Sequence, residues 1–285
     1  MLKVAVIGMG RFGQHHARIY QEIPEVDMVA SCDILADHGV YDPEPSYRQY
    51  TSYEALLDNE CPDIVSVAVP TESHFEVVLG CLARDVDVLV EKPLASTIGQ
   101  AGLLMGIAKE KELILAVGHV ERFNPIITEL KRVIDFLGMP EYIETYRSGP
   151  RPTRRQQDCI ALELAIHDID VIRYLVGDIE FKGACMTQSG FRGTYGLSHN
   201  GQASVSAHYG APKRTISVQF DEWWFFGDYL AKTIKVRRGS EISLVSLSGP
   251  EPLYLELQEF VDVANGGVFR VLATAEDGLA AMRLV

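Results

Sequence analysis

Hydrophobic positions in the first 120 residues form short continuous runs that alternate with amphipathic stretches. The runs predict strands covered on both faces, and the stretches between them predict helices. The predicted strands are residues 2–8, 26–33, 63–70, 86–91 and 113–119, and the predicted helices are residues 11–23, 51–59, 71–85 and 97–112. Alternating strands and helices form βαβ units, so we expect a parallel, right-handedly wound sheet.

The pattern changes after His119. Two helical stretches, residues 122–138 and 160–178, are followed by mostly strand-like alternation to about Leu247. Alternation of this kind predicts a second, α+β domain built on a largely antiparallel sheet. We therefore expect two domains, residues 1–120 and residues 121–285.

Composition and charge exclude several classes of partner. The net charge of −13 argues against nucleic acid or an anionic membrane as partner. No apolar run reaches the length that spans a bilayer, and the N-terminus enters a strand without a signal-peptide layout. The five cysteines are odd in number, scattered and without a CxxC pair, which predicts reduced thiols in a cytoplasmic protein.

A glycine-rich stretch, "VAVIGMGRFG", follows the first predicted strand and opens a helix. Gly8, Gly10 and Gly13 have the GxGxxG spacing of a dinucleotide-binding turn, in which the backbone approaches a pyrophosphate at the helix N-terminus. Asp33 ends the second strand, where an acid hydrogen-bonds the adenosine ribose. Asp33 would repel a 2′-phosphate, so NAD is favoured over NADP. A tight turn without a ligand is the alternative.

The chain resembles the Gfo/Idh/MocA oxidoreductases over nearly its whole length. The segments that carry the resemblance are "GMGRFGQHHA", "VAVPTESHFEVV", "VLVEKPLA", "VGHVERFNP", "LAIHDIDVIRYLVGD" and the closing "EPLYLELQEFVDVANGG…ATAEDGLAAMRL". The resemblance implies an N-terminal Rossmann domain with a doubly wound parallel sheet, and a C-terminal α/β domain with an open sheet. It also implies an active cleft between the two.

The family resemblance assigns roles to Glu91 and Lys92, which end a predicted core strand. Such strand ends bind ligands in parallel sheets, and neighbouring strand residues point in opposite directions. The resemblance implies that Glu91 contacts the nicotinamide ribose and Lys92 the reacting hydroxyl. A solvated surface pair is the alternative. The predicted cofactor-binding set is Gly8, Gly10, Arg11, Phe12, Gly13, Asp33, Pro70, Thr71, His74 and Glu91. For His74, a residue at the helix N-terminus with a purely local hydrogen bond is the alternative.

Glu163, His167 and Asp170 share one face of the second predicted helix of the C-terminal half. His167 matches the histidine of the family's Asp-x-x-x-His motif, which implies that it takes the substrate hydroxyl proton. Glu163 occupies the aspartate position, a departure that lengthens the side chain by one methylene. The predicted catalytic residues are Lys92, His167 and Glu163. Alternatives are a solvent-exposed helix face or a metal site, and we predict no metal.

The segment "RSGPRPTRRQQD" carries several arginines in an otherwise acidic chain. Arginine is suited to phosphate contact, and within the family the segment looks most like the nucleotide-sugar dehydrogenases, including those acting on UDP-N-acetylglucosamine. The predicted substrate-binding residues are Arg122, Asn124, Arg151, Arg154 and Arg155. A solvated loop or a subunit contact is the alternative for the segment.

Two classes of function remain from the sequence. The first is an NAD-dependent dehydrogenase of a sugar, with a nucleotide sugar as the leading substrate and an inositol-type polyol or free sugar as the alternative. The second is a nicotinamide-binding regulator that has lost catalysis. The family resemblance further implies a homodimer or homotetramer.

Overall fold

The computed structural model describes residues 1–35, 46–151 and 159–285, which divide into two compact units. Unit 1 comprises Met1–Val120 and Leu253–Leu279, and unit 2 comprises Glu121–Pro252 and Ala280–Val285. Unit 2 begins where the sequence placed its domain boundary. Residues 253–279, which the sequence assigned to the second domain, group with unit 1.

Unit 1 is built on a seven-stranded sheet, ordered β15-β6-β5-β4-β1-β2-β3. All neighbouring strands are parallel except β15 and β6. The strands are β1 (Leu2–Ile7), β2 (Val26–Cys32), β3 (Arg48–Tyr50), β4 (Ile64–Val67), β5 (Asp87–Glu91), β6 (Leu115–Gly118) and β15 (Ala273–Thr274). The interior strands β1, β4, β5 and β6 are buried almost throughout, which explains their continuous apolar runs.

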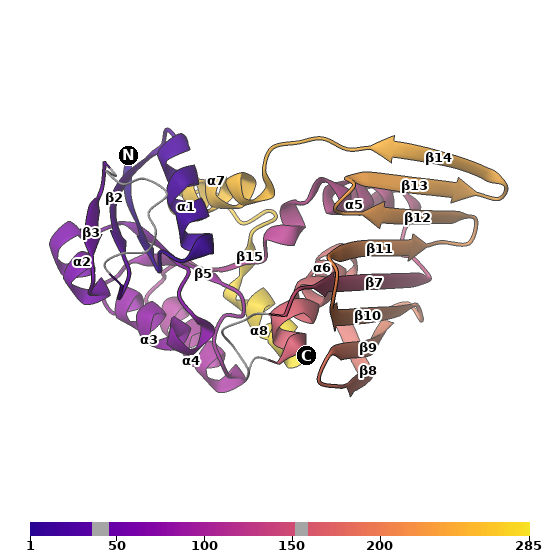
Figure 1. The fold of residues 1–285 in the computed structure, drawn as a ribbon, viewed down its shortest axis with the longest axis horizontal. Helices are drawn as coiled ribbons and strands as arrows, with labels where there is room; N and C mark the ends of the chain where they lie inside the picture. Colours follow the sequence, from indigo (N-terminus) through magenta and orange to yellow (C-terminus); the bar gives the residue numbers. More distant parts are fainter. Residues whose placement is uncertain (36–45, 152–158) are drawn as a thin grey trace. The chain divides into compact units, whose positions relative to one another are not determined.

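Helices cover both faces of this sheet. They are α1 (Arg11–Glu22), α2 (Tyr53–Glu60), α3 (Thr71–Leu82), α4 (Ile98–Glu110), α7 (Pro252–Ala264) and α8 (Ala275–Arg283), which crosses the division between the units. Within unit 1, α2, α3 and α4 lie together on one face, and α1 and α7 lie on the other (Figure 1). Ser52 and Thr97 cap α2 and α4 by accepting hydrogen bonds from backbone N–H groups.

Unit 2 is built on an eight-stranded sheet, ordered β14-β13-β12-β11-β7-β10-β9-β8, with its strands side by side in Figure 1. The strands are β7 (Tyr142–Gly149), β8 (Ile179–Met186), β9 (Gly190–Leu197), β10 (Gln202–Tyr209), β11 (Lys213–Gln219), β12 (Trp223–Asp228), β13 (Thr233–Arg238) and β14 (Glu241–Ser246). Only β7 and β10 pair in parallel. The predicted fold class, a parallel Rossmann sheet and a largely antiparallel sheet, is confirmed.

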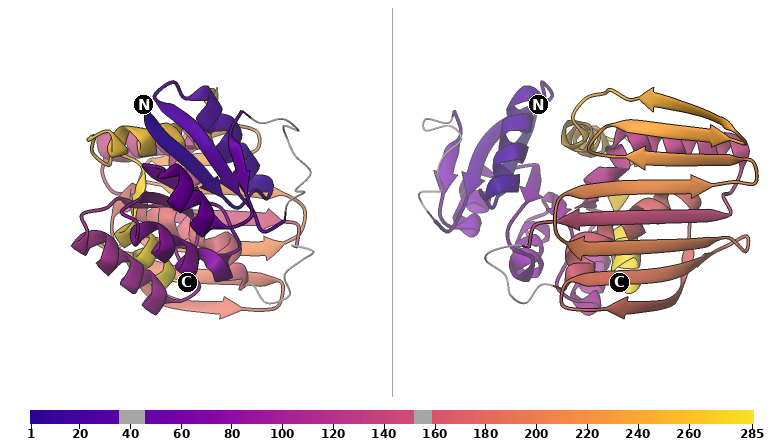
Figure 2. Two further views of the ribbon diagram at one scale, coloured as in Figure 1. Left: turned by 90° about the vertical axis from the view of Figure 1, so that its left-hand side faces the viewer. Right: turned by 45° about the vertical axis from the view of Figure 1, so that its right-hand side comes forward.

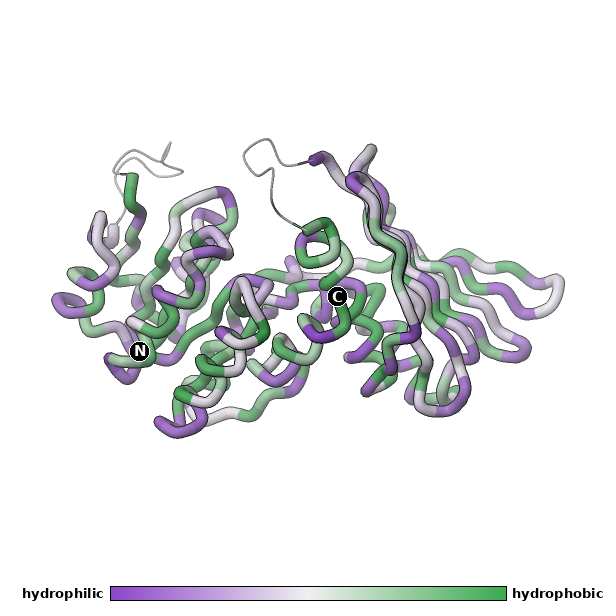
Figure 3. The backbone as a smooth tube through the Cα atoms, turned by 90° about the horizontal axis from the view of Figure 1, so that it is seen from below, coloured by the Kyte–Doolittle hydropathy of each residue, from purple (hydrophilic) through white to green (hydrophobic). Residues whose placement is uncertain are grey.

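The helical elements of unit 2 lie on one face of its sheet, as the right-hand view of Figure 2 shows. They are the short 3₁₀ helix η1 (Val120–Phe123), α5 (Pro125–Leu137), the π-helical turn η2 (Ala161–Ala165) and α6 (Ile166–Val176). Hydrophobic and hydrophilic stretches alternate along the strands, consistent with one covered face (Figure 3). Buried positions of α5 and α6, including Ile126, Leu130, Ile169 and Ile172, contribute to the core beneath that face.

Candidate active site

The glycine-rich turn joins β1 to α1 and requires its first and third glycines. Gly8 has φ +95°, and a Cβ there would lie 2.6 Å from the carbonyl carbon of Ala68. A Cβ on Gly13 would lie 1.7 Å from the Gly8 carbonyl oxygen. The helix α1 carries no side-chain cap and no acidic residue in its first turn. The turn and the uncapped helix start therefore fit a dinucleotide pyrophosphate.

The middle of the turn is open. Nothing lies within 4 Å of a Cβ built on Gly10, whose backbone is exposed. Arg11 and Phe12, the next two residues, are also exposed, and Phe12 is 57% accessible despite its apolar ring. The predicted cofactor contacts of these residues stay predictions, and their exposure leaves the backbone within reach of a ligand.

Asp33 lies beside the glycine turn. Its carboxylate accepts hydrogen bonds from the backbone N–H of Met9, at 2.7 Å, and from that of Leu35, at 3.1 Å. The first bond ties the end of β2 to the turn after β1, and the ribose contact predicted for Asp33 stays a prediction. Neighbouring Asp33 also affects Cys32: burial, followed by the negative charge of Asp33, raises the pKa of the Cys32 thiol to about 12.

Glu91 ends β5 and is paired with a histidine of α1. His16 is fully buried, and its Nε2 lies 3.2 Å from Glu91 Oε1. Burial raises the pKa of the Glu91 carboxyl, but the hydrogen bond and charge of His16, with Lys92, outweigh burial and hold the pKa below its ordinary value. The pair therefore holds an ionised carboxylate at the strand end and ties it to the helix that follows the glycine turn.

Sequence reasoning did not select His16. The signal was available in its position, because a histidine on the buried face of α1 needs a polar partner. The partner, Glu91, is 75 residues away in the sequence, so the sequence around His16 does not predict which residue it pairs with.

The loop after β4 and the turn after β5 meet at His74. This buried side chain places Nδ1 2.7 Å from the carbonyl oxygen of Pro93 and Nε2 3.0 Å from that of Val69. Pro93 follows Lys92 through a cis peptide bond. Pro70 and Thr71 start α3 in this loop, and the Thr71 carbonyl accepts a hydrogen bond from Ser96. His74 thus holds together two loops that carry predicted cofactor residues.

In unit 2, Glu163 lies in the π-helical turn η2 and His167 in the first turn of α6. The turn is closed by the Ile166 N–H, which donates to the Ala161 carbonyl five residues earlier. Glu163 and His167 are both partly exposed and lie about one turn apart. The sequence predicted an uninterrupted α-helix here, so the π-helical turn is a correction. Single π-helical turns are frequent at functional sites, but their hydrogen bonds leave no clear sequence signal.

Glu163 and Arg151 both contact Tyr209, the last residue of β10. The Tyr209 hydroxyl donates to Glu163 Oε2 at 2.7 Å, and the Arg151 guanidinium carbon lies 5.3 Å from the centre of the Tyr209 ring. Sequence reasoning did not select Tyr209. Arg154 and Arg155, predicted with Arg151 to bind substrate, lie outside the described residues.

Arg122 and Asn124 have partners inside unit 2. The guanidinium of Arg122 is buried and bonds both carboxylate oxygens of Asp170, at 2.8 and 2.7 Å. Asn124 caps α5 by accepting a hydrogen bond from the Ile126 N–H. These contacts give both residues a structural role that the sequence analysis did not foresee, and their predicted substrate contacts stay predictions. Asp170, considered as a metal ligand from the sequence, is bound by Arg122.

Arg147 of β7 lies at the centre of a buried ionic cluster. Its guanidinium bonds both carboxylate oxygens of Asp168, at 2.8 and 3.1 Å, and Glu121 Oε1, at 2.9 Å. Half-exposed Arg214 also reaches Glu121 Oε1, at 3.1 Å. Because Asp168 follows His167 directly, the cluster anchors the start of α6 to the sheet.

The cluster affects its two carboxyls differently. Burial raises the pKa of Asp168 above its ordinary value, and Arg147 offsets only part of that rise. Burial also raises the pKa of Glu121, but the charges of Arg147 and Arg214 outweigh it and hold the pKa below its ordinary value. Burial lowers the pKa of the Arg147 guanidinium, but the charges of Asp168 and Glu121 raise this pKa by more than burial lowers it. The guanidinium therefore stays charged.

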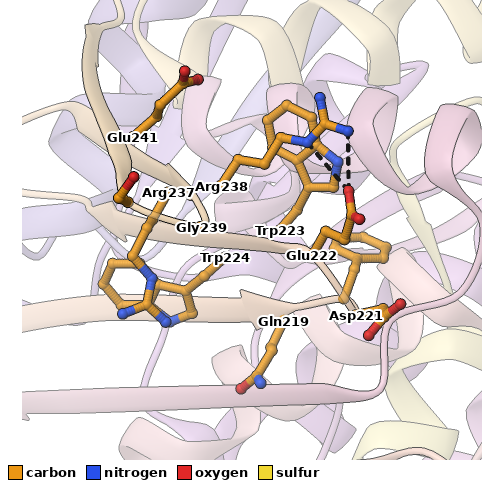
Figure 4. A pocket seen from close by; sticks show the side chains of 11 residues that line it. Gln219, Asp221, Glu222, Trp223, Trp224, Arg237, Arg238, Gly239 and Glu241 are labelled. Atoms are coloured by element: carbon orange, nitrogen blue, oxygen red, sulfur yellow. Dashed lines mark hydrogen bonds and ion pairs between the residues drawn. The ribbon is translucent and has the colours of Figure 1, made fainter.

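A shallow pocket of about 640 Å³ lies at the β11–β12 and β13–β14 turns of unit 2, and Figure 4 shows its lining. Arg238 lies 4.9 Å from the centre of the Trp223 ring, and Arg237 lies 5.4 Å from that of Trp224. Since arginines of the same chain cover these rings, they do not form an open stacking platform. The neighbouring Phe225 belongs to the core. No predicted site residue lines this pocket.

No group of three or more histidine, cysteine, aspartate or glutamate side chains in residues 1–35, 46–151 and 159–285 is arranged to hold a metal ion. Over the same residues, no helix has the length and apolar character needed to cross a membrane.

Comparison with known proteins matches the N-terminal part of this chain to a family model. Residues 2–119 match the family model described as "Oxidoreductase family, NAD-binding Rossmann fold", Gfo/Idh/MocA. The N-terminal part of this chain is thus similar to the NAD-binding domain of the Gfo/Idh/MocA oxidoreductases. The resemblance inferred from the sequence is thereby confirmed, and the model describes the domain that carries the glycine turn, Asp33 and Glu91.

Some relatives are similar over nearly the whole chain. The UDP-N-acetylglucosamine 3-dehydrogenase of Acidithiobacillus ferrooxidans is 28% identical over 96% of this chain and 95% of its own length. A solved structure of that enzyme has a TM-score of 0.87 with 26% identity, covering 99% of this chain and 94% of the other. The scyllo-inositol 2-dehydrogenase (NAD(+)) of Bacillus subtilis is 29% identical over 62% of this chain and 54% of its own length. Dehydrogenases acting on CH–OH groups are therefore the named relatives.

Proposed function

We propose that this protein is an NAD-dependent dehydrogenase that oxidises a secondary hydroxyl of a nucleotide sugar such as UDP-N-acetylglucosamine. The observation that carries the proposal is the His16–Glu91 pair, because it joins the Glu91-Lys92 strand end to the helix of the glycine turn. Both features lie at the carboxyl ends of parallel strands, where such sheets bind ligands.

The cofactor side of the proposal uses residues of unit 1. When bound, a nicotinamide supplies the acceptor for a hydride. The glycine turn holds the pyrophosphate, and the ionised Glu91 accepts hydrogen bonds from the nicotinamide ribose. Asp33 accepts hydrogen bonds from the adenosine ribose and repels a 2′-phosphate, which favours NAD over NADP.

The acid–base side of the proposal uses Lys92, His167 and Glu163, with roles taken from the family resemblance. Lys92 donates a hydrogen bond to the reacting hydroxyl and orients it. His167 accepts the hydroxyl proton as the hydride leaves the same carbon, and Glu163 supports His167 with its negative charge. A positioned base of this kind contributes about 10²–10⁴-fold to the rate.

The nucleotide-sugar substrate is supported by two observations. A relative that is similar over 96% of this chain is named for UDP-N-acetylglucosamine. Arg151 is exposed and follows the end of β7 by two residues, and arginine binds phosphate oxygens well. We include Arg154 and Arg155 in this proposed phosphate site on sequence grounds.

An inositol-type polyol is the second candidate substrate. It is favoured by relatives named as inositol dehydrogenases, whose similarity covers 62% of this chain. A regulator that binds nicotinamide without catalysis would need the Glu163 departure to abolish proton transfer.

We further propose a cytoplasmic homodimer or homotetramer. Strand β14 is exposed along its whole length and carries the apolar side chains Ile242, Leu244 and Val245, which are 60%, 67% and 43% accessible. An exposed apolar edge of this kind is typical of a protein–protein interface.

A thermal-shift comparison with NAD present tests the substrate. UDP-N-acetylglucosamine should raise the melting temperature by mass action, while N-acetylglucosamine without the diphosphate should not at the same concentration. Rising salt should weaken the effect because the phosphate contact is charged and partly exposed. A shift with inositols or free sugars and none with any UDP-sugar would replace the nucleotide sugar with a polyol or free sugar.

A further inference from the structure

Tyr209 touches two of the predicted functional residues at once. Its hydroxyl donates to Glu163 Oε2 at 2.7 Å, and its ring lies under the Arg151 guanidinium at 5.3 Å. The first contact connects Tyr209 to the π-helical turn η2, which carries Glu163. The second connects it to Arg151 of the proposed phosphate site. The side chain thus joins the acid–base and the substrate-binding parts of unit 2.

The sheet fixes the position of Tyr209. Residues 202–209 of β10 run parallel to β7, and Tyr209 is in register with Gly149, two residues before Arg151. The Tyr209 backbone N–H also donates to the Ser189 carbonyl at 3.0 Å. Both contacts of the side chain therefore start from a backbone that is held by β7 and by the turn between β8 and β9.

The hydroxyl contact bears on the unusual length of Glu163. Glutamate has one more rotatable bond than the aspartate expected at this position, and each additional rotamer state disfavours a single carboxylate position. A hydrogen bond from a phenol to a carboxylate is charge-assisted and therefore strong enough to select one rotamer. An aspartate at position 163 would be one methylene too short to reach the same hydroxyl without movement of the backbone.

We propose that Tyr209 is a positioning residue, which fixes the Glu163 carboxylate through its hydroxyl and the Arg151 guanidinium through its ring. The proposal rests on the proposed dehydrogenase function. The hydroxyl contact acts on the rate of the chemical step, whereas the ring contact acts on substrate binding.

Two substitutions separate the contacts. Tyr209→Phe removes the hydroxyl and keeps the ring, so kcat should fall about tenfold while KM changes less than about twofold. Tyr209→Leu removes both, so KM for the phosphate-bearing substrate should also rise, by about fivefold or more. Tyr142→Phe is the matched control, since its hydroxyl contacts Ser204 in the same sheet and no predicted site residue. Its kcat should equal that of the wild type.

A double-mutant cycle tests the link to Glu163. In a Glu163→Asp background, Tyr209→Phe should change kcat less than about twofold, because the shortened carboxylate no longer receives the bond. A wild-type kcat for Tyr209→Phe, or effects of the two substitutions that multiply, would overturn the proposal.

The readouts separate this proposal from the proposed function. The kinetic comparison is made with whichever sugar or polyol the wild type oxidises, so a wrong substrate leaves it intact. If the wild type oxidises none, the proposed function fails, and the same cycle is measured by melting temperature. Non-additive shifts for Tyr209→Phe and Glu163→Asp would then support the contact, and additive shifts would overturn it.

Discussion

The two units of this protein place their charged residues in different ways. In unit 1, the candidate functional charges Asp33 and Glu91 lie at the carboxyl ends of two parallel strands of one sheet, β2 and β5, and are partly exposed. In unit 2, Arg147, Asp168 and Glu121 are 3%, 2% and 7% accessible and bond one another across β7, α6 and η1. Charges at strand ends can contact ligands directly, whereas the buried cluster holds a helix in position.

This difference indicates where each unit is vulnerable. Loss of a strand-end charge in unit 1 should affect ligand binding and leave the fold intact. Loss of the central charge in unit 2 leaves other buried charges without a partner, which is costly to stability. The following substitutions test that contrast, from the largest expected effect to the smallest.

Arg147→Met should destabilise unit 2 by about 3–5 kcal/mol, because it leaves Asp168 and part of Glu121 buried without their counterion. Arg214→Met is the control, since Arg214 is half-exposed and should cost less than about 1 kcal/mol. Urea unfolding followed by tryptophan fluorescence reports on unit 2, because both tryptophans, Trp223 and Trp224, lie there. Equal stability of the two variants would contradict the structural role of the cluster.

Gly13→Ala should destabilise unit 1 by about 1–3 kcal/mol and abolish tight NAD binding, since the added methyl group meets the Gly8 carbonyl. Gly102→Ala in α4 is the matched control. Nothing lies within 4 Å of its Cβ position, and alanine is the better helix former, so stability should hold or rise by up to about 1 kcal/mol. Calorimetric titration with NAD measures the binding. Normal NAD affinity in Gly13→Ala would count against the assigned cofactor site.

Asp33 should make NAD at least tenfold better than NADP in kcat/KM and in affinity, a difference of about 1.4 kcal/mol. Asp33→Asn keeps an acceptor for the Met9 N–H and removes the negative charge. It should therefore reduce the preference for NAD over NADP while the glycine-rich turn keeps its structure. Equal use of the two cofactors by the wild type would remove Asp33 from its assigned role.

The sequence predicted unit 1 better than unit 2 for a physical reason. The glycine turn, Asp33 and Glu91-Lys92 belong to short motifs whose chemistry follows from a strand end, so they are visible locally. The bonds of Arg147 to Asp168 and Glu121 join residues 21 and 26 positions apart, and nothing local pairs them. Arg147 therefore looked like one more arginine of a surface segment, whereas the structure buries it.

The same limit applies to the partners of the residues that the sequence selected. Glu91 was selected from its motif, but His16 is supplied by α1. Glu163 was selected from its spacing to His167, but Tyr209 comes from a strand 46 residues away. Residues 253–279 also group with unit 1 because β15 pairs with β6. A strand of two residues is too short to be predicted from the sequence, so this long-range pairing could not be predicted either.

The central claim is that this chain oxidises a sugar hydroxyl with NAD, using Lys92 and His167. The most direct measurement is the initial rate of reduced-nicotinamide formation from UDP-N-acetylglucosamine and NAD, made on the wild type, Lys92→Ala and His167→Ala, with NAD affinity measured separately. The account predicts wild-type turnover and a fall in kcat of about 10²-fold or more in each variant, while NAD still binds. Turnover at the wild-type rate in both variants would contradict it.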